Sequence, residues 1–431
     1  MIRAMLRMSV RWRTALLFLL GGLAWMMSAC EAQDPLPTRV VAIATVEIQP
    51  TGQLAPSAAS MVPPTFTPAP RETIEIQSLD QGGTAPDDGP WVTATVPTRT
   101  PTSTATATST ATATRYVSVI PELPPTDELG PSKLGLHVVR NNDPNIMEFV
   151  RRAQPAVMKA VDDFGFLAEV REVSPRTITV GRHSDAILDF SGDPVKAAQD
   201  FVAEHLETYQ LNPAVDYWEG YNEPDPNEAN MIWYSRFEQE RCLIMAEHGF
   251  RCAIGGFPTG VPELDEFQLF LPAIDVAKRV GGVLTLHEYS APDMFYLYGG
   301  ALPGYPSYPD RGALTFRYRW FYHEILEPAD LVIPLIITEA GIDGIIGNRP
   351  GPPGTGWWDF QTYWEEQGLG ASGRQAFINQ LAWYDAGVRQ DGYVIGFTVF
   401  TAGGFGYWEK YDINPILPEL TEYVVSQRDS Q

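Results

Sequence analysis

The feature that most constrains the fold is a regular alternation of apolar runs and helical patterns that begins after Lys133. Apolar runs of strand length occupy residues 134–139, 156–161, 177–181, 215–221, 252–256, 283–289, 335–338 and 394–400. Helical periodicity fills most of the intervals, for example at residues 194–209, 229–248, 264–280, 314–326 and 371–388. Eight strands separated by helices, within roughly 300 residues, predict an α/β fold of the (β/α)8 or TIM barrel type.

A doubly wound open sheet is the rival fold for such an alternation. That fold usually carries a Gly-x-Gly-x-x-Gly turn after its first strand, and no such turn follows residues 134–139. In addition, residues with useful chemistry recur at the ends of many strands rather than at one crevice, which favours the barrel.

The first 29 residues are predicted to be a signal peptide. Four arginines lie among the first 13 residues and precede an apolar run, residues 15–25, that is too short to span a bilayer comfortably. The sequence Met27-Ser28-Ala29-Cys30 resembles the lipobox of bacterial lipoproteins, in which the cysteine becomes the lipidated first residue. An ordinary signal peptide with a chance Cys30 is the alternative. Both interpretations predict export, and lipidation at Cys30 would anchor the protein to the extracellular face of the cell membrane.

Residues 30–132 are predicted to be a disordered stalk. They are rich in Pro and Thr and culminate in a tract of Thr, Ala, Ser and Pro at residues 98–114. Such a composition buries too little apolar surface to offset the entropy of ordering the chain. We therefore expect the folded barrel domain to comprise residues 133–431.

The charge balance excludes some partners. The chain has 53 Asp and Glu against 30 Lys and Arg, a formal net charge of -23, which disfavours binding to nucleic acid or to an anionic membrane surface. We expect the lipid anchor to be the only membrane contact and the protein to be a monomer. The sequence gives no reason to expect a cofactor.

Two glutamates follow or lie in predicted strands. Glu223 comes after the run Tyr217-Trp218-Glu219-Gly220-Tyr221-Asn222, and Glu339 comes after Leu335-Ile336-Ile337-Thr338. In a barrel the carboxyl ends of all strands meet at one face, so both carboxylates should meet there. Cleavage of a glycosidic bond with retention needs one protonated and one ionised carboxyl group about 5–5.5 Å apart. The pair therefore predicts a glycosidase, and the alternative is that each glutamate only caps a strand or pairs with an arginine.

Other polar residues are expected at the same barrel face. By strand position they are His137 on the first strand, Arg182 and His183 on the third, Asn222 on the fourth, and His287 and Tyr289 on the sixth. We expect all of them to contribute to substrate binding. Glu219 shares the side-chain parity of Glu223 and is expected to form a buried ion pair.

The combination of Asn222-Glu223-Pro224, His287-x-Tyr289 and Glu339 resembles clan A retaining glycoside hydrolases, and the His-x-Tyr pair is similar to cellulase-like members such as family 5. The resemblance implies that Glu223 is the general acid/base, that Glu339 is the nucleophile, and that Tyr289 donates a hydrogen bond to it. Asn222 would contact the sugar 2-hydroxyl and His287 would line the floor. The substrate implied is a β-linked poly- or oligosaccharide.

Two positions depart from the family pattern. The family usually places an arginine on the second strand, where this chain has Lys159, and a tryptophan on the eighth strand, where this chain has Val399-Phe400-Thr401.

Aromatic residues supply the stacking surfaces that pyranose rings need. The long connections after the seventh and eighth strands contain Trp357, Trp358 and Trp408, which we expect to line the site. The alternative for each ring is a small core beneath the loops.

Two other classes of function remain open from the sequence. A metal-dependent barrel hydrolase would need paired ligands such as His-x-His on the first strand, but His137 is followed by two valines, so we expect no metal. A non-catalytic glycan-binding surface lipoprotein on the same scaffold is the second alternative.

Cys242 and Cys252 complete the set of three cysteines with Cys30. Export would permit a disulfide. However, a helix and a strand in adjacent layers are about 10 Å apart, so we expect two buried thiols.

Overall fold

The structure is a computed structural model that describes residues 116–126 and 129–429. The predicted signal peptide, the lipidation site Cys30 and residues 30–115 of the predicted stalk lie outside the described residues. Within the described ranges, no helix has both the length and the apolar character needed to cross a membrane.

Eight parallel strands form a closed barrel in sequence order, with β8 pairing back onto β1. The strands are β1 (Leu134–Val138), β2 (Val157–Val161), β3 (Ile178–Arg182), β4 (Tyr217–Glu219), β5 (Cys252–Phe257), β6 (Val283–Ser290), β7 (Leu335–Ile342) and β8 (Val394–Ala402). The predicted barrel is thus confirmed and the open-sheet alternative is wrong. All strands of such a barrel are covered on both faces, which is why they appear in the sequence as continuous apolar runs.

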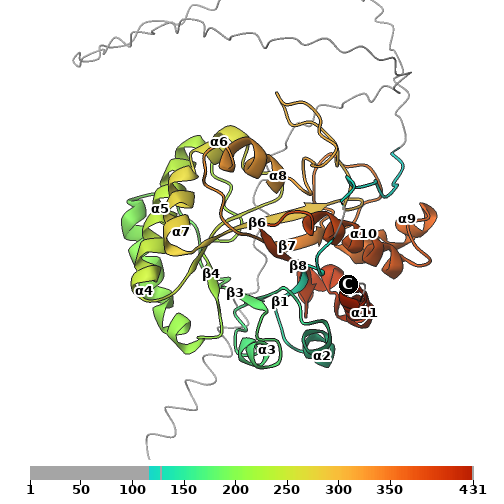
Figure 1. Ribbon diagram of the computed structural model, residues 1–431, viewed down its shortest axis with the longest axis horizontal. Helices are drawn as coiled ribbons and strands as arrows, with labels where there is room; N and C mark the ends of the chain where they lie inside the picture. The colour runs from blue at the N-terminus through green and yellow to red at the C-terminus, as the bar shows by residue number, and fades with distance from the viewer. Residues whose placement is uncertain (1–115, 127–128, 430–431) are drawn as a thin grey trace, which may run out of the picture. The chain divides into compact units, whose positions relative to one another are not determined.

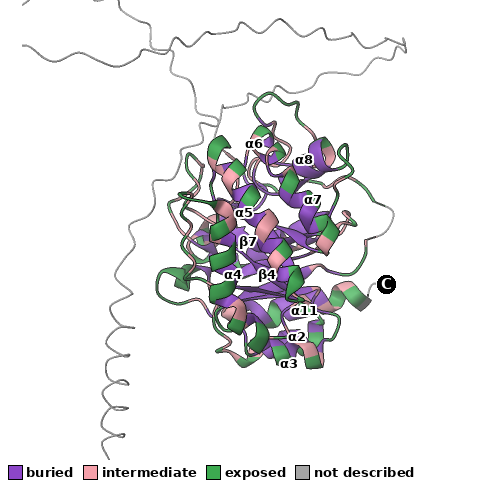
Figure 2. Cartoon of the chain, turned by 90° about the vertical axis from the view of Figure 1, so that its left-hand side faces the viewer, coloured by how far each residue is buried: buried purple, intermediate pink, exposed green. Residues whose placement is uncertain are grey.

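The helices lie around the outside of the barrel, as Figure 1 shows. They are α2 (Pro144–Ala153), α3 (Leu167–Val173), α4 (Pro194–Leu211), α5 (Glu228–Glu247), α6 (Leu264–Gln268), α7 (Leu271–Val280), α8 (Tyr318–Phe321), α9 (Gln361–Glu366), α10 (Gly373–Val388) and α11 (Leu417–Asp429). A π-helical turn, η1 (Tyr322–Leu326), follows α8, and short 3₁₀ turns are η2 (Trp357–Phe360), η3 (Gly406–Tyr411) and η4 (Asn414–Ile416). In Figure 2 the strands are buried, whereas the outer faces of the helices are exposed.

Predicted boundaries differ from the structure at several elements, including β4, β7 and the helix predicted at residues 264–280. Strand β4 ends at Glu219, earlier than predicted, so Glu223 lies in the connection that follows it. Strand β7 continues to Ile342, past the predicted end at Glu339, because its ladder with β6 extends to the Ser290–Ile342 pair. The helix predicted at residues 264–280 is divided into α6 and α7, and Pro272 lies in the first turn of α7.

Cys242 of α5 and Cys252 of β5 form a disulfide, so the expectation of two free thiols is wrong. Their Cα atoms are 5.4 Å apart, well below the spacing of a helix and a sheet. The distance between element axes was the wrong measure. Cys242 lies on the buried side of α5 and Cys252 is the first residue of β5, so the two Cα atoms come closer than the two axes.

Residues 116–126 pack against the barrel domain, although the sequence predicted them to be part of the stalk. Tyr116 and Ser118 donate hydrogen bonds to the buried Asp293 carboxylate in the connection after β6. The Trp383 indole of α10 donates to the carbonyl of Pro121 at 3.0 Å. The side chains of Ile120 and Leu123 pack on the core of the domain. The predicted boundary between stalk and domain at residue 132 is therefore placed too far along the chain, because residues 116–126 already pack on the domain.

The revised boundary gives a stability prediction. A chain that begins at Tyr116 should be more stable than one that begins at Gly130, because the shorter chain leaves the Asp293 carboxylate buried without two of its donors. The lost hydrogen bonds and apolar contacts correspond to about 2–4 kcal/mol. Thermal unfolding should then show a Tm that is roughly 5–10 °C lower for the shorter chain. Equal Tm values would show that residues 116–126 contribute nothing to stability.

Candidate active site

The register of the strands builds a polar layer on top of an apolar one inside the barrel. The apolar layer contains Val157, Val180, Tyr217, Ala253, Val283 and Ile336. Because side chains alternate between the two faces of a strand, the residues two positions further along also point inward. These are Lys159, Arg182 and Glu219, and together with Glu339 they form a buried charged layer toward the carboxyl ends of the strands.

Glu339 accepts hydrogen bonds on both carboxylate oxygens. Tyr289 donates to Oε2 at 2.7 Å, while Arg182 and Lys159 donate to Oε1 at 2.8 and 3.1 Å. Burial by itself would raise the pKa of Glu339, but the neighbouring His287, Lys159 and Arg182 together hold that pKa well below its usual range. Glu339 is therefore a fixed anion whose position is set by three donors from β2, β3 and β6.

Lys159 connects Glu339 to a second buried carboxylate. Its Nζ lies 2.9 Å from Glu219 Oε2, and Thr338 donates to Glu219 Oε1 at 2.7 Å. Burial would raise the pKa of Glu219, but Lys159 and Arg182 lower it to about 2. Glu219 is thus the buried ion-pair partner that the sequence predicted, and Lys159 serves two anions at once.

Glu223 lies above this layer and is more accessible than Glu339. Its side chain is 39% exposed, against 6% for Glu339. The residue adopts a left-handed backbone conformation with φ of 45°, and its N–H donates to the carbonyl of Gly256. Such a conformation is uncommon and costly for a non-glycine residue, so the surrounding structure holds Glu223 in place.

His287 lies between the two carboxylates. Its Nδ1 is 2.9 Å from Glu223 Oε1 and 3.6 Å from Glu339 Oε2. One oxygen of Glu223, one oxygen of Glu339 and a ring nitrogen of His287 all lie within 4.8 Å of one another. The two carboxylates that the sequence singled out therefore come together at the mouth of the barrel.

These three residues could in principle hold a metal ion, but the surrounding charges do not suit one. Oε1 of Glu339 already accepts hydrogen bonds from the cations Lys159 and Arg182, and Oε2 accepts one from the Tyr289 hydroxyl. A divalent ion placed at this carboxylate would lie close to two fixed positive charges. The donors Lys159, Arg182 and Tyr289 instead suit a carboxylate that stays ionised without a metal.

His137 lies beneath Glu339, whereas His183 lies outside the barrel. Nε2 of His137 is 3.4 Å from Glu339 Oε1, and burial lowers the His137 pKa to about 4, so the ring is uncharged at neutral pH. The His183 ring stacks on His205 of α4 with a centroid distance of 4.1 Å. Since Arg182 takes the inward position on β3, the next residue must point outward, and the expectation that His183 binds substrate is wrong.

The predicted aromatic residues divide into core and rim. Trp357 is buried, stacks on Phe377 of α10 and belongs to the core, so it is not a stacking surface for substrate. Trp358 and Trp408 are 37% and 39% exposed and form the rim.

Asn222, the other predicted binding residue on the β4 side, is exposed beside Glu223.

Phe400 of β8 lines the site at a position where the sequence departs from the family pattern. Its ring lies 6.1 Å from that of Tyr289, 4.8 Å from that of His137 and 5.1 Å from that of Trp408. An aromatic residue does therefore line the site from β8. Phe400 lies on the strand next to β7, which carries Glu339, and this position could have identified it as a site residue from the sequence.

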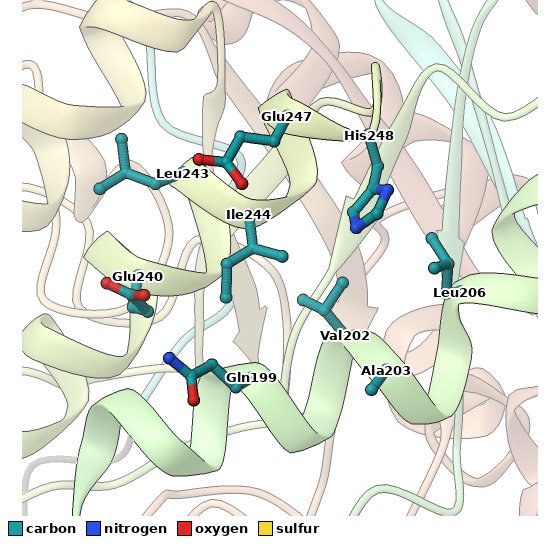
Figure 3. Close-up of a pocket in the computed structure, with 9 residues that line it drawn as sticks. All are labelled: Gln199, Val202, Ala203, Leu206, Glu240, Leu243, Ile244, Glu247 and His248. Carbon is teal, nitrogen blue, oxygen red and sulfur yellow. The ribbon is translucent and has the colours of Figure 1, made fainter.

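A separate hollow lies on the outside of the barrel between α4 and α5, and Figure 3 shows its lining residues. They include Leu206, Leu243 and His248. None of the residues around Glu339 contributes to it.

Comparisons with known proteins find matches only among solved structures. No family model matches the chain, and no curated protein sequence does. Among solved structures, N2152 from Neocallimastix frontalis is 15% identical, with a TM-score of 0.32 over 49% of this chain and 52% of that chain, so the match spans about half of N2152. XacCel5A is 10% identical, with a TM-score of 0.40 over 69% of this chain and 99% of that chain. The endo-1,4-beta-D-mannanase from Thermotoga petrophila RKU-1 is 13% identical, with a TM-score of 0.37 over 68% and 99%.

Proposed function

We propose that the barrel domain is a retaining glycoside hydrolase that cleaves β-linked poly- or oligosaccharides. The observation that carries this proposal is the pairing of a buried, multiply hydrogen-bonded Glu339 with the more accessible Glu223, with one oxygen of each carboxylate within 4.8 Å of the other. Carboxyl groups about 5–5.5 Å apart are typical of retaining enzymes, and inverting enzymes need roughly 6.5–9.5 Å to admit a water.

The roles follow from the two environments. Glu339 is held as an anion and attacks the anomeric carbon, while Glu223 donates its proton to the departing glycosidic oxygen. The bond from the anomeric carbon to that oxygen breaks as the bond to Glu339 forms. In the second half, Glu223 as carboxylate removes a proton from water, the water oxygen attacks the anomeric carbon, and Glu339 departs as the free anion. Tyr289, Arg182 and Lys159 stabilise that anion in both halves.

We further propose that the enzyme acts outside the cell, bound to the membrane through a lipid on Cys30. The arginine-rich start, the short apolar run and the sequence Met27-Ser28-Ala29-Cys30 support this placement. Metabolic labelling with a fatty acid should label the wild type and leave Cys30→Ser unlabelled.

The function is tested by a panel of chromogenic β-glycosides and β-linked polysaccharides. We expect hydrolysis of at least one of them, with NMR showing that the first product has the same anomeric configuration as the substrate. Inverted product would contradict the double-displacement mechanism. Binding without any hydrolysis would instead identify a glycan-binding protein.

The charges around Glu339 predict the acid side of the pH profile. Because the Glu339 pKa is held below its usual range, activity should persist as the pH falls to about 4.5 and be lost only below it. Arg182→Gln removes one stabilising cation, so the Glu339 pKa should rise and the acid limb of kcat/KM should move up by about one pH unit or more.

A matched control for this shift is Arg251→Gln. Arg251 is also bound to a carboxylate, that of Asp216 at 3.0 Å, but its side chain is 46% exposed and contacts neither Glu223 nor Glu339. The acid limb of this variant should stay at the wild-type position. An unmoved limb in Arg182→Gln, with the fold intact by thermal unfolding, would show that Arg182 does not set the Glu339 pKa.

A further inference from the structure

A third carboxylate, Asp343, stands at the same mouth and has no part in the mechanism above. Asp343 comes directly after β7, four residues beyond Glu339, and its N–H extends the ladder by donating to the carbonyl of Ser290 at 3.2 Å. Residues 339, 341 and 343 alternate with 340 and 342 along an extended chain. Asp343 therefore shares the orientation of Glu339, one level further out toward solvent.

The Asp343 carboxylate is oriented through one of its two oxygens. Tyr411 of η3 donates to Oδ1 at 2.8 Å, and the N–H of Ile345 donates to the same oxygen at 3.1 Å. No described residue donates a hydrogen bond to Oδ2. This oxygen is therefore available to a donor from outside the chain.

Asp343 is also electrostatically coupled to Glu223. Burial raises the pKa of Asp343 to about 6 against the hydrogen bonds from Ile345 and Tyr411, and the negative charge of Glu223 adds to the rise. The charge of Asp343 likewise contributes to the raised pKa of Tyr289, the partner of Glu339. Asp343 thus lies within electrostatic range of both sides of the catalytic pair.

An aromatic wall connects Asp343 to the buried carboxylate layer. The rings form a chain. The distance between ring centroids is 6.1 Å for Tyr289 and Phe400, 5.6 Å for Phe400 and Tyr411, and 5.4 Å for Tyr411 and Trp408. Trp408 is 39% exposed at the outer end. The rings of Tyr289, Phe400 and Tyr411 are buried, so Trp408 provides most of the accessible aromatic surface. A pyranose ring needs an apolar surface for its C–H face and acceptors for its hydroxyls, and the outer end of this wall together with Asp343 presents both.

We propose that Asp343 is a sugar-binding residue, whose Oδ2 accepts a hydrogen bond from a ring hydroxyl of the sugar unit attacked by Glu339, while that ring lies against the aromatic wall. The ligand class is a neutral pyranose. The inference rests on the proposed function, because it places the anomeric carbon between Glu339 and Glu223. Tyr411 acts through Asp343 by fixing the orientation of the carboxylate.

The test combines a protein variant with altered substrates. The aryl β-glycoside that wild type hydrolyses fastest is compared with analogues that lack one ring hydroxyl each, in wild type and in Asp343→Asn. An asparagine keeps an oxygen for the Tyr411 bond but removes the charge. For one hydroxyl, wild type should lose about 10- to 100-fold in kcat/KM on deoxygenation. Asp343→Asn should show a similar loss with the full substrate and little further loss with that analogue, which demonstrates the pairing.

The control is Asp359→Asn in the same connection after β7. Asp359 bonds to Thr355 and Lys410, and none of its hydrogen bonds or ion pairs within the described residues reaches Asp343, Glu223 or Glu339, so this variant should keep the wild-type response to every deoxygenated substrate. The inference would be overturned if, for every hydroxyl, the loss caused by Asp343→Asn and the loss caused by removing that hydroxyl simply added.

A binding experiment keeps the inference separate from the proposed function. Calorimetric titration with the matching unmodified sugar and with its thio-linked disaccharide should show weaker binding to Asp343→Asn than to wild type and Asp359→Asn. If wild type binds the sugars but hydrolyses nothing, the proposed function fails and the Asp343 site stands. Equal affinities of Asp343→Asn and wild type would overturn the site, as would the absence of any sugar binding.

Discussion

Glu339→Ala should lose on the order of 10⁴-fold or more in kcat/KM, because it removes the group that forms the covalent intermediate. The fold should survive the change. Lys159, one of the two cations that lose a partner, keeps its contact with Glu219. Circular dichroism and thermal unfolding measure this directly, so a loss of activity can be separated from a loss of structure.

Azide distinguishes this variant from a protein that is merely damaged. The missing side chain leaves space on the face of the sugar from which Glu339 attacks, and a small anion can enter it. Azide should restore cleavage of an activated aryl glycoside: it forms a bond to the anomeric carbon as the aryl group leaves as its phenolate, and the glycosyl azide has inverted configuration because azide attacks only once. Full activity of Glu339→Ala without azide would show that the two-carboxylate mechanism is wrong.

Glu223→Ala should lose roughly 10² to 10⁴ in rate with substrates whose leaving group needs a proton. The loss should be much smaller with dinitrophenyl glycosides, because that leaving group departs as an anion. The measurement is the dependence of kcat/KM on the leaving-group pKa, which should be steep for Glu223→Ala and shallow for wild type.

In Glu223→Ala, azide should give the opposite stereochemistry to that found with Glu339→Ala. Glu339 still forms the glycosyl-enzyme, and azide then attacks it from the face that Glu223 once occupied, so the product keeps its configuration. The pair of outcomes assigns one role to each glutamate. Identical azide products from both variants would contradict that assignment.

The sequence was sufficient to predict the fold and to predict that Glu223 and Glu339 lie close together, because both depend on local patterns. Apolar runs at regular intervals predict the barrel, and a glutamate beyond such a run is delivered to one face. Strand parity also explains the error over His183, since the inward position on β3 already belonged to Arg182. Treating both neighbours as site residues ignored the alternation of side chains along a strand.

Other features depend on contacts between distant segments and could not be read from local patterns. The bond between Tyr411 and Asp343 joins residues 68 apart, and Lys159 meets Glu339 only when β2 and β7 face each other across a closed barrel. The link from Cys242 to Cys252 depended on which side of α5 the sulfur occupies. The contacts of residues 116–126 have no periodic signal at all, because single side chains such as Tyr116 make them.

The attachment of Tyr116 and Ser118 has a mechanical consequence. Asp293 follows β6 closely, and Ser118 also lies within hydrogen-bonding distance, 2.9 Å, of Tyr363 in α9. A pulling force applied to the chain before residue 116 would therefore load these contacts first, before it reached β1. In force spectroscopy with the chain held at residue 116 and at the C-terminus, extension should begin with a small early rupture that releases residues 116–126. The barrel, with its continuous ring of strand pairs, should yield only at a later and larger force.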